Sequence, residues 1–94
     1  MFKELDPLLH SELRLSIISL LISVESADFS YIKEKTGASS GNISVQIEKL
    51  RVAGYIKVEK GYRGKIPQTM CSISQEGIVA FEKYVDALKS YIMP

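Results

Sequence analysis

A helical pattern, a glycine turn, a second helical pattern and an alternating ribbon follow one another between residues 28 and 68. This order limits the fold more than any other feature of the chain. Residues 29–36 have apolar side chains at helical spacing and precede Gly37, which suits the left-handed position just past a helix end. A second helix is expected over residues 39–53, with one buried stripe at i, i+4 and i+7: Ile43, Ile47 and Leu50.

A β-hairpin with a basic tip is predicted after the second helix. Residues 55–60 alternate apolar and charged side chains, and residues 69–74 can pair with them after the turn residues Gly61, Gly64 and Pro67. Residues 57–68 hold a net charge of +3, residues 1–30 hold −3, and the whole chain only +1. The basic hairpin could neutralise phosphates and give affinity that falls with salt. A solvated hairpin tip without a partner is the alternative.

The face of the second helix opposite its buried stripe has the chemistry needed to read DNA bases. Small residues there permit close approach to a groove floor, Asn and Gln can bond adenine bidentately, and Val can meet a thymine methyl. Glu48 argues against DNA binding, because phosphates repel a carboxylate, although it could accept from a cytosine amine. A generic α+β domain that buries a core with these elements is the alternative. The candidate DNA-binding residues on this helix are Ser39, Ser40, Gly41, Asn42, Ser44, Val45, Gln46 and Lys49.

Residues 28–30, 37–55, 58–62 and 64–69 resemble the small winged-helix transcriptional regulators related to the MarR and ArsR groups. The match extends to residues 5–7, 10–14 and 74–77, and so covers nearly the whole chain. The resemblance implies a mainly helical α+β fold, a winged helix-turn-helix with a two-stranded β-hairpin wing and an additional C-terminal helix. It makes residues 39–53 the recognition helix and residues 60–67 the wing tip, although Ile66 and Gln68 stand where arginines are common. The candidate DNA-binding residues of the wing are Lys60, Tyr62, Arg63 and Lys65.

The first and last helices carry more apolar surface than one small domain needs. We expect a helical segment within residues 1–26, with Pro7 at a helix start, and a last helix over residues 75–93 capped by Ser74. The two helices either cover each other within one chain or pair across a symmetric homodimer. We expect the homodimer, which would meet a palindromic site with half-sites about 34 Å apart. The candidate interface residues are Leu5, Leu9, Leu13, Ile17, Phe81, Tyr84, Val85, Leu88, Tyr91 and Ile92.

The composition argues against an enzyme. The chain has one His and one Cys, which are too few for a Cys/His zinc site, so no metal is expected. We expect His10 to cap or pack, and Cys71 to act as a small buried apolar residue. The dispersed glycines form no phosphate-cradling loop, so no nucleotide cofactor is expected.

The N-terminal residues and the apolar runs predict where the protein works. The first residues are too polar for a signal peptide, and the apolar run over residues 15–24 is too short to span a bilayer. We therefore expect a cytoplasmic protein that forms one domain over residues 1–94, divided into residues 1–26, 28–54, 55–74 and 75–93.

The expected function is that of a homodimeric regulator of transcription, which binds double-stranded DNA at a short palindromic operator. A small apolar effector could lie between the first and last helices, although nothing polar converges there in the sequence to identify it. The alternative is a winged helix that grips another protein, with Val45, Val52 and Tyr62 as its anchors.

Overall fold

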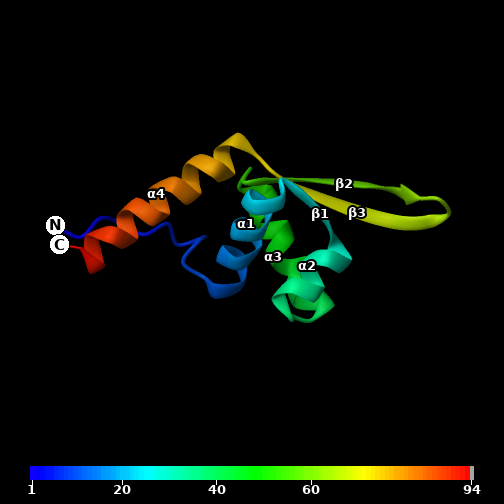
Figure 1. Ribbon diagram of the computed structural model, residues 1–94, viewed down its shortest axis with the longest axis horizontal. Helices are drawn as coiled ribbons and strands as arrows, with labels where there is room; N and C mark the ends of the chain where they lie inside the picture. Colours follow the sequence, from blue (N-terminus) through cyan, green and yellow to red (C-terminus); the bar gives the residue numbers. More distant parts are fainter. Residues whose placement is uncertain (94) are drawn as a thin grey trace.

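The computed structural model describes residues 1–93 and contains four helices and three strands (Figure 1). Their order is α1 (Glu12–Val24), β1 (Ser26–Asp28), α2 (Phe29–Thr36), α3 (Ser40–Val52), β2 (Ile56–Arg63), β3 (Ile66–Ile73) and α4 (Gln75–Ile92). Two successive helices followed by an antiparallel hairpin form a winged helix-turn-helix. The fold class predicted from the sequence is therefore confirmed.

Local capping determines where α2, α3 and α4 begin. The Asp28 carboxylate accepts a hydrogen bond from the Tyr31 backbone N–H at 2.7 Å, and the Ser39 hydroxyl accepts from the Asn42 N–H at 3.2 Å. Ser74 does the same for Gly77 at 3.0 Å. Each bond satisfies an N–H group that has no partner inside the helix. Gly37 ends α2 in the left-handed conformation, with φ of 71°, as its sequence position predicts.

The sheet has three antiparallel strands in the order β1-β3-β2. The third strand, β1, was not predicted, because three residues are too few to show alternation. The hairpin is also longer than predicted: β2 and β3 pair without a break as far as Arg63 and Ile66, so only Gly64 and Lys65 form the turn. Pro67 is tolerated inside β3 because β1 pairs only with residues 70–72, which leaves that edge of β3 open.

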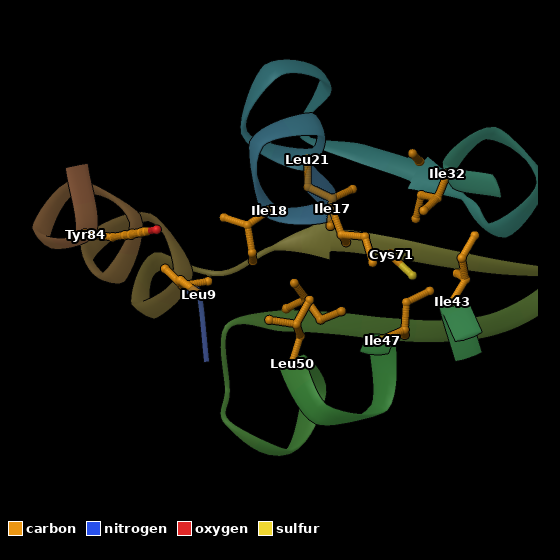
Figure 2. Close-up of a cluster of buried hydrophobic side chains, with 12 residues drawn as sticks. Leu9, Ile17, Ile18, Leu21, Ile32, Ile43, Ile47, Leu50, Cys71 and Tyr84 are labelled. Atoms are coloured by element: carbon orange, nitrogen blue, oxygen red, sulfur yellow. The ribbon is translucent and has the colours of Figure 1, made fainter. Parts of the chain in front are cut away.

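The core lies between the three N-terminal helices and the sheet (Figure 2). The predicted stripe on α3 is buried and packs opposite α1, where Ile17, Ile18 and Leu21 are fully buried. Cys71 lies among them on β3, and burial raises the pKa of its thiol to about 11. The expectation that Cys71 is a small buried apolar residue is confirmed.

The N-terminal segment differs from the prediction. Residues 1–11 form turns and extended chain, and the first helix starts only at Glu12, so Pro7 does not begin a helix. The segment runs beside the end of α4, where the Lys3 backbone N–H donates to Ser90 Oγ at 3.0 Å and the Tyr91 hydroxyl donates to the Lys3 carbonyl at 3.1 Å. Phe2 stacks on the Tyr91 ring with 4.8 Å between centroids. The chain therefore covers one side of α4 with its own N-terminus.

The molecule is elongated because α4 and the wing extend in opposite directions from the core (Figure 1). Its extents are 53 × 25 × 21 Å, and its radius of gyration is 14.1 Å. A compact chain of this length would have a radius of about 12 Å. The outer half of α4 therefore lies away from the core and is covered on one side only.

Candidate nucleic-acid interface

The outward face of α3 is accessible along its whole length. Asn42, Val45 and Lys49 recur at i, i+3 and i+7, so they share one face, and all three side chains are exposed. Val45 exposes 52% of its surface. The predicted residues Ser39, Ser40, Gly41 and Ser44 are also exposed, although the Ser39 hydroxyl already accepts the capping bond. The structure thus brings most of the residues predicted on this helix to one surface.

Gln46 differs from these residues because it is partly buried and hydrogen-bonded on both sides of its amide. Its Oε1 accepts from Arg14 Nη1 at 2.5 Å, and its Nε2 donates to Asn42 Oδ1 at 2.9 Å. Arg14 lies on α1 and was not among the predicted site residues. It is the one basic residue in a helix of mainly apolar side chains, and that isolation is the signal by which a specific partner could have been predicted.

Glu48, which argued against DNA binding, is neutralised by its neighbour on the helix. Arg51 donates to both carboxylate oxygens, at 2.8 and 2.5 Å. This hydrogen bond holds the pKa of Glu48 below its usual value, and Lys60 at the start of the wing adds a smaller contribution. A carboxylate paired in this way repels phosphate less than an isolated one.

The wing presents the predicted basic residues to solvent. Lys60, Arg63 and Lys65 are exposed, and neither of the two ion pairs found in residues 1–93 involves them. Tyr62 exposes 75% of its surface. Gln68, which stands where arginine is common, instead donates to Asp28 Oδ2 at 3.2 Å and ties the wing to the start of α2. The wing's cations are therefore available to an anionic partner.

The predicted dimer interface is partly wrong. Leu9 and Ile17 expose none of their surface and Tyr84 only 5%, because all three pack into the chain's own core. The Tyr84 hydroxyl also lies 3.0 Å from His10 Nδ1, which gives His10 the packing role expected for it. Leu5, Leu13 and Phe81 are half-buried within the chain. The exposed candidates are Val85, Leu88, Tyr91 and Ile92.

A pocket of about 500 Å³ lies between the N-terminal segment, Tyr55 and the first half of α4. No residue of α1 lines it, and charged side chains converge on it, so it differs from the apolar site expected between the first and last helices. Tyr55 donates to Asp6 Oδ2 at 2.5 Å, and burial, with this hydrogen bond, raises the pKa of Tyr55 to about 12. The pocket is lined by Glu4, Asp6, Tyr55, Gln75, Glu76, Val79, Ala80, Lys83 and Tyr84.

Within residues 1–93, no helix combines the length and apolar character needed to cross a membrane. No group of three or more His, Cys, Asp or Glu side chains in the same range could hold a metal ion.

Comparisons with known proteins agree with this geometry. Residues 13–92 match the family described as winged helix DNA-binding domain. The chain is 32% identical to an uncharacterised protein of Methanocaldococcus jannaschii over 77 residues, which cover 81% of this chain and 83% of that protein. It is 27% identical to a transcriptional regulator homologue from Pyrococcus horikoshii OT3, with a TM-score of 0.84 over 90% of this chain and 84% of the other.

The same fold occurs within a longer chain. The oxidised form of MarR from E. coli superposes with a TM-score of 0.69 at 15% identity, over 86% of this chain and 57% of MarR. At this identity the likeness shows a fold shared with MarR, as the resemblance read from the sequence predicted. The family is one of DNA-binding domains, which agrees with the expectation that the chain is not an enzyme. The chain therefore belongs to the winged-helix DNA-binding domain family, as a small member related in fold to MarR.

Proposed function

We propose that this protein regulates transcription by binding double-stranded DNA sequence-specifically through α3 and the wing. The observation that carries the proposal is the outward face of α3. Its N-terminal half carries mainly small, hydroxyl and amide side chains, and within residues 1–93 no carboxylate forms an ion pair with the cations of the neighbouring wing. A helix of this kind fits the major groove, which is wide enough to admit it and carries the base-specific pattern of donors and acceptors.

The two elements would have different tasks. Ser40, Asn42, Ser44 and Val45 would contact base edges from α3. Lys49 and the wing cations Lys60, Arg63 and Lys65 would contact phosphates, which position the protein without reading sequence. Ser39 and Gly41 at the start of α3, and Tyr62 on the wing, would lie at the edge of the contact.

We propose further that two copies pair through α4. Its uncovered side carries Val85, Leu88 and Ile92 at i, i+3 and i+7, all at least one-third exposed, whereas its other side is covered by the N-terminal segment. An apolar stripe of this spacing is typical of a helix that pairs with a second helix. A symmetric pair would place two α3 helices on a palindromic operator.

The pocket beside α4 is our proposed site for a small-molecule effector. Its walls come from the N-terminal segment, from Tyr55 just before β2, and from α4. A ligand held there would contact both the proposed dimer helix and the start of the wing. It could therefore bias the angle between them.

A protein partner is the second candidate function. Val52 at the end of α3 exposes 71% of its surface, and Tyr62 on the wing exposes 75%. Exposed apolar and aromatic side chains of this size are typical anchors of protein interfaces. Salt distinguishes the two functions, because binding through phosphates weakens steeply as salt rises and an apolar contact does not.

The proposed function can be tested with the purified protein and a pool of randomised duplex DNA. The retained DNA is sequenced at two salt concentrations, and the mass of the protein is recorded in solution. We expect a dimer that retains a palindrome, with retention that falls as salt rises. A variant with Lys60, Arg63 and Lys65 replaced by Ala should lose retention, whereas the distant Lys89→Ala should not. Absence of any enriched sequence at low salt would argue for a protein partner instead.

A further inference from the structure

A chain of hydrogen bonds links α1 to the outward face of α3. Arg14 Nη1 donates to Gln46 Oε1 at 2.5 Å, and Gln46 Nε2 donates in turn to Asn42 Oδ1 at 2.9 Å. Arg14 is itself held in place, because its Nε donates to the Leu8 carbonyl at 2.6 Å. This series of hydrogen bonds therefore links a fixed, partly buried guanidinium group to an exposed amide on the face proposed to meet DNA.

The direction of every bond in this chain follows from the chemistry of its first member. A guanidinium group only donates hydrogen bonds, so Gln46 has to turn its carbonyl oxygen toward Arg14. Its NH2 group then faces Asn42. An NH2 group donates as well, so Asn42 has to present its carbonyl oxygen to Gln46. Turning the Asn42 amide round would bring two NH2 groups together and lose that hydrogen bond.

The consequence is that Asn42 exposes the donating edge of its amide. Within residues 1–93 no hydrogen bond of its Nδ2 was found, and the side chain shares its face with Val45 and Lys49. A bidentate pair with adenine needs the carbonyl and the NH2 of the amide together, whereas guanine presents two acceptors, N7 and O6. The bond from Gln46 already engages the Asn42 carbonyl oxygen and leaves it one lone pair, whereas both protons of the NH2 group stay unengaged in the part of the chain that the structure describes. The exposed NH2 group therefore suits guanine better than adenine.

We propose that Arg14 is a positioning residue that acts through Gln46 to hold Asn42 as a hydrogen-bond donor, so that Asn42 reads guanine in preference to adenine. This inference rests on the proposed function, since it takes α3 as the recognition helix. It also revises the expectation from the sequence for two residues. Gln46 transmits the orientation instead of reading a base, and Asn42 does not bond adenine bidentately.

The test is selection from a randomised duplex pool with the full chain and a set of variants. Asn42→Ala identifies the operator position that Asn42 contacts, because only there should the base preference disappear. At that position we expect wild type to favour guanine over adenine about fivefold or more. Arg14→Met and Gln46→Met free the Asn42 amide to rotate, and both should shift the ratio toward adenine by a similar factor. Arg14→Lys keeps the preference, because an ammonium group also only donates.

The double variant Arg14→Met/Gln46→Met separates this positioning role from a direct contact between Arg14 and DNA. If the two residues act in one chain, the double variant shows the same base ratio as either single variant. If each touched DNA independently, their effects would add. Gln46 lies near the surface, so Gln46→Met carries the test should an Arg14 variant fail to fold, which the thermal unfolding curve of each variant reports.

The possible outcomes separate this inference from the function on which it rests. If wild type enriches no sequence at low salt, the proposed function is wrong and the inference with it. If wild type enriches an operator in which adenine dominates at the Asn42 position, only the inference is overturned. The same holds if Arg14→Met and Gln46→Met both fold and leave the ratio of guanine to adenine unchanged.

Discussion

Replacing Gly77 by Ala should destabilise the protein, because the start of α4 packs directly against the backbone before β2. Gly77 is buried in the first turn of α4. A Cβ atom added there would lie 2.1 Å from the Tyr55 carbonyl oxygen and 2.8 Å from Ile73 Cδ1. The same Tyr55 oxygen accepts a hydrogen bond from the Ser74 N–H at 3.1 Å. The Tyr55 carbonyl and the Ser74 N–H cannot move apart without weakening the hydrogen bond that joins α4 to the residue before β2.

The size of the destabilisation follows from the 2.1 Å distance between the added Cβ atom and the Tyr55 oxygen. A Cβ contact has to reach at least 3.0 Å, so the first turn of α4 must move away from Tyr55 by at least 0.9 Å. Overpacking of this kind costs about 1–3 kcal/mol, and weakening the Ser74 bond costs about 1 kcal/mol more. Alanine in a helix regains about 0.5–1 kcal/mol relative to glycine. We expect a net loss of about 2 kcal/mol, which lowers the Tm by roughly 8 to 16 °C in a domain of this size.

Gly41→Ala is the matched control for this prediction. Gly41 also lies in the first turn of a helix, but nothing lies within 4 Å of an added Cβ atom. This variant should be as stable as wild type or more stable by up to about 1 kcal/mol. Thermal unfolding followed by circular dichroism measures both variants at one protein concentration, because the Tm of an oligomer depends on concentration. A Gly77→Ala protein that unfolds at the wild-type temperature would refute the reasoning about this junction.

Three further predictions concern the wing, the dimer helix and the buried thiol. Arg63→Ala should weaken binding to all duplex sequences alike and reduce the slope of log affinity against log salt by about 1, with Lys89→Ala as control. The double variant Leu88→Lys/Ile92→Lys should sediment as a folded monomer, whereas Val24→Lys, at an exposed site on α1, should not change the mass. Burial raises the pKa of Cys71 from 9.0 to about 11, so the unfolded thiol ionises first. Stability attributable to Cys71 is therefore complete below pH 9 and is lost as the pH rises to about 11, and chemical denaturation of Cys71→Val should lack this loss.

Each of these predictions has a contrary result. An unchanged salt slope for Arg63→Ala would exclude the wing from the contact with DNA. A dimer that survives both lysines on α4 would move the interface elsewhere. For Cys71, the Tyr55 hydroxyl contributes a second loss in the same direction between about pH 10 and 12, since its pKa is also raised. Cys71→Val should therefore lack the loss between about pH 9 and 11 and keep the Tyr55 loss between about pH 10 and 12. Identical pH profiles for variant and wild type would contradict the assignment.

The helix-turn-helix could be predicted from the sequence because its determinants are local. Gly37 ends α2, Ser39 begins α3, and the stripe on α3 is buried, as the spacing of the residues indicates. A cap depends on the conformation of one residue and on an N–H group two or three positions away. Helical periodicity likewise depends only on neighbours within two turns. These features are readable without knowing what packs against them.

The length of the wing was less predictable. Gly61 and Pro67 usually mark a turn, so the tip was expected between them, whereas both strands continue to Arg63 and Ile66. Pairing along a ladder overrides the local preference of single residues when each strand supplies partners for the other. The strand β1 has three residues and exists only because β3 offers it an edge.

The amino-acid sequence alone predicted the order of the elements apart from β1, the caps, the apolar stripe of α3 and the basic wing. The tertiary structure decided which apolar residues became core and which stayed uncovered. Leu9 and Ile17 are buried, while Leu88 and Ile92 on the projecting part of α4 are not. It also decided that Arg14 reaches Gln46, 32 residues away along the chain, and so orients Asn42. The physical reason is that caps and periodicity act between neighbours in sequence, whereas burial and the Arg14 hydrogen bond depend on how whole helices pack.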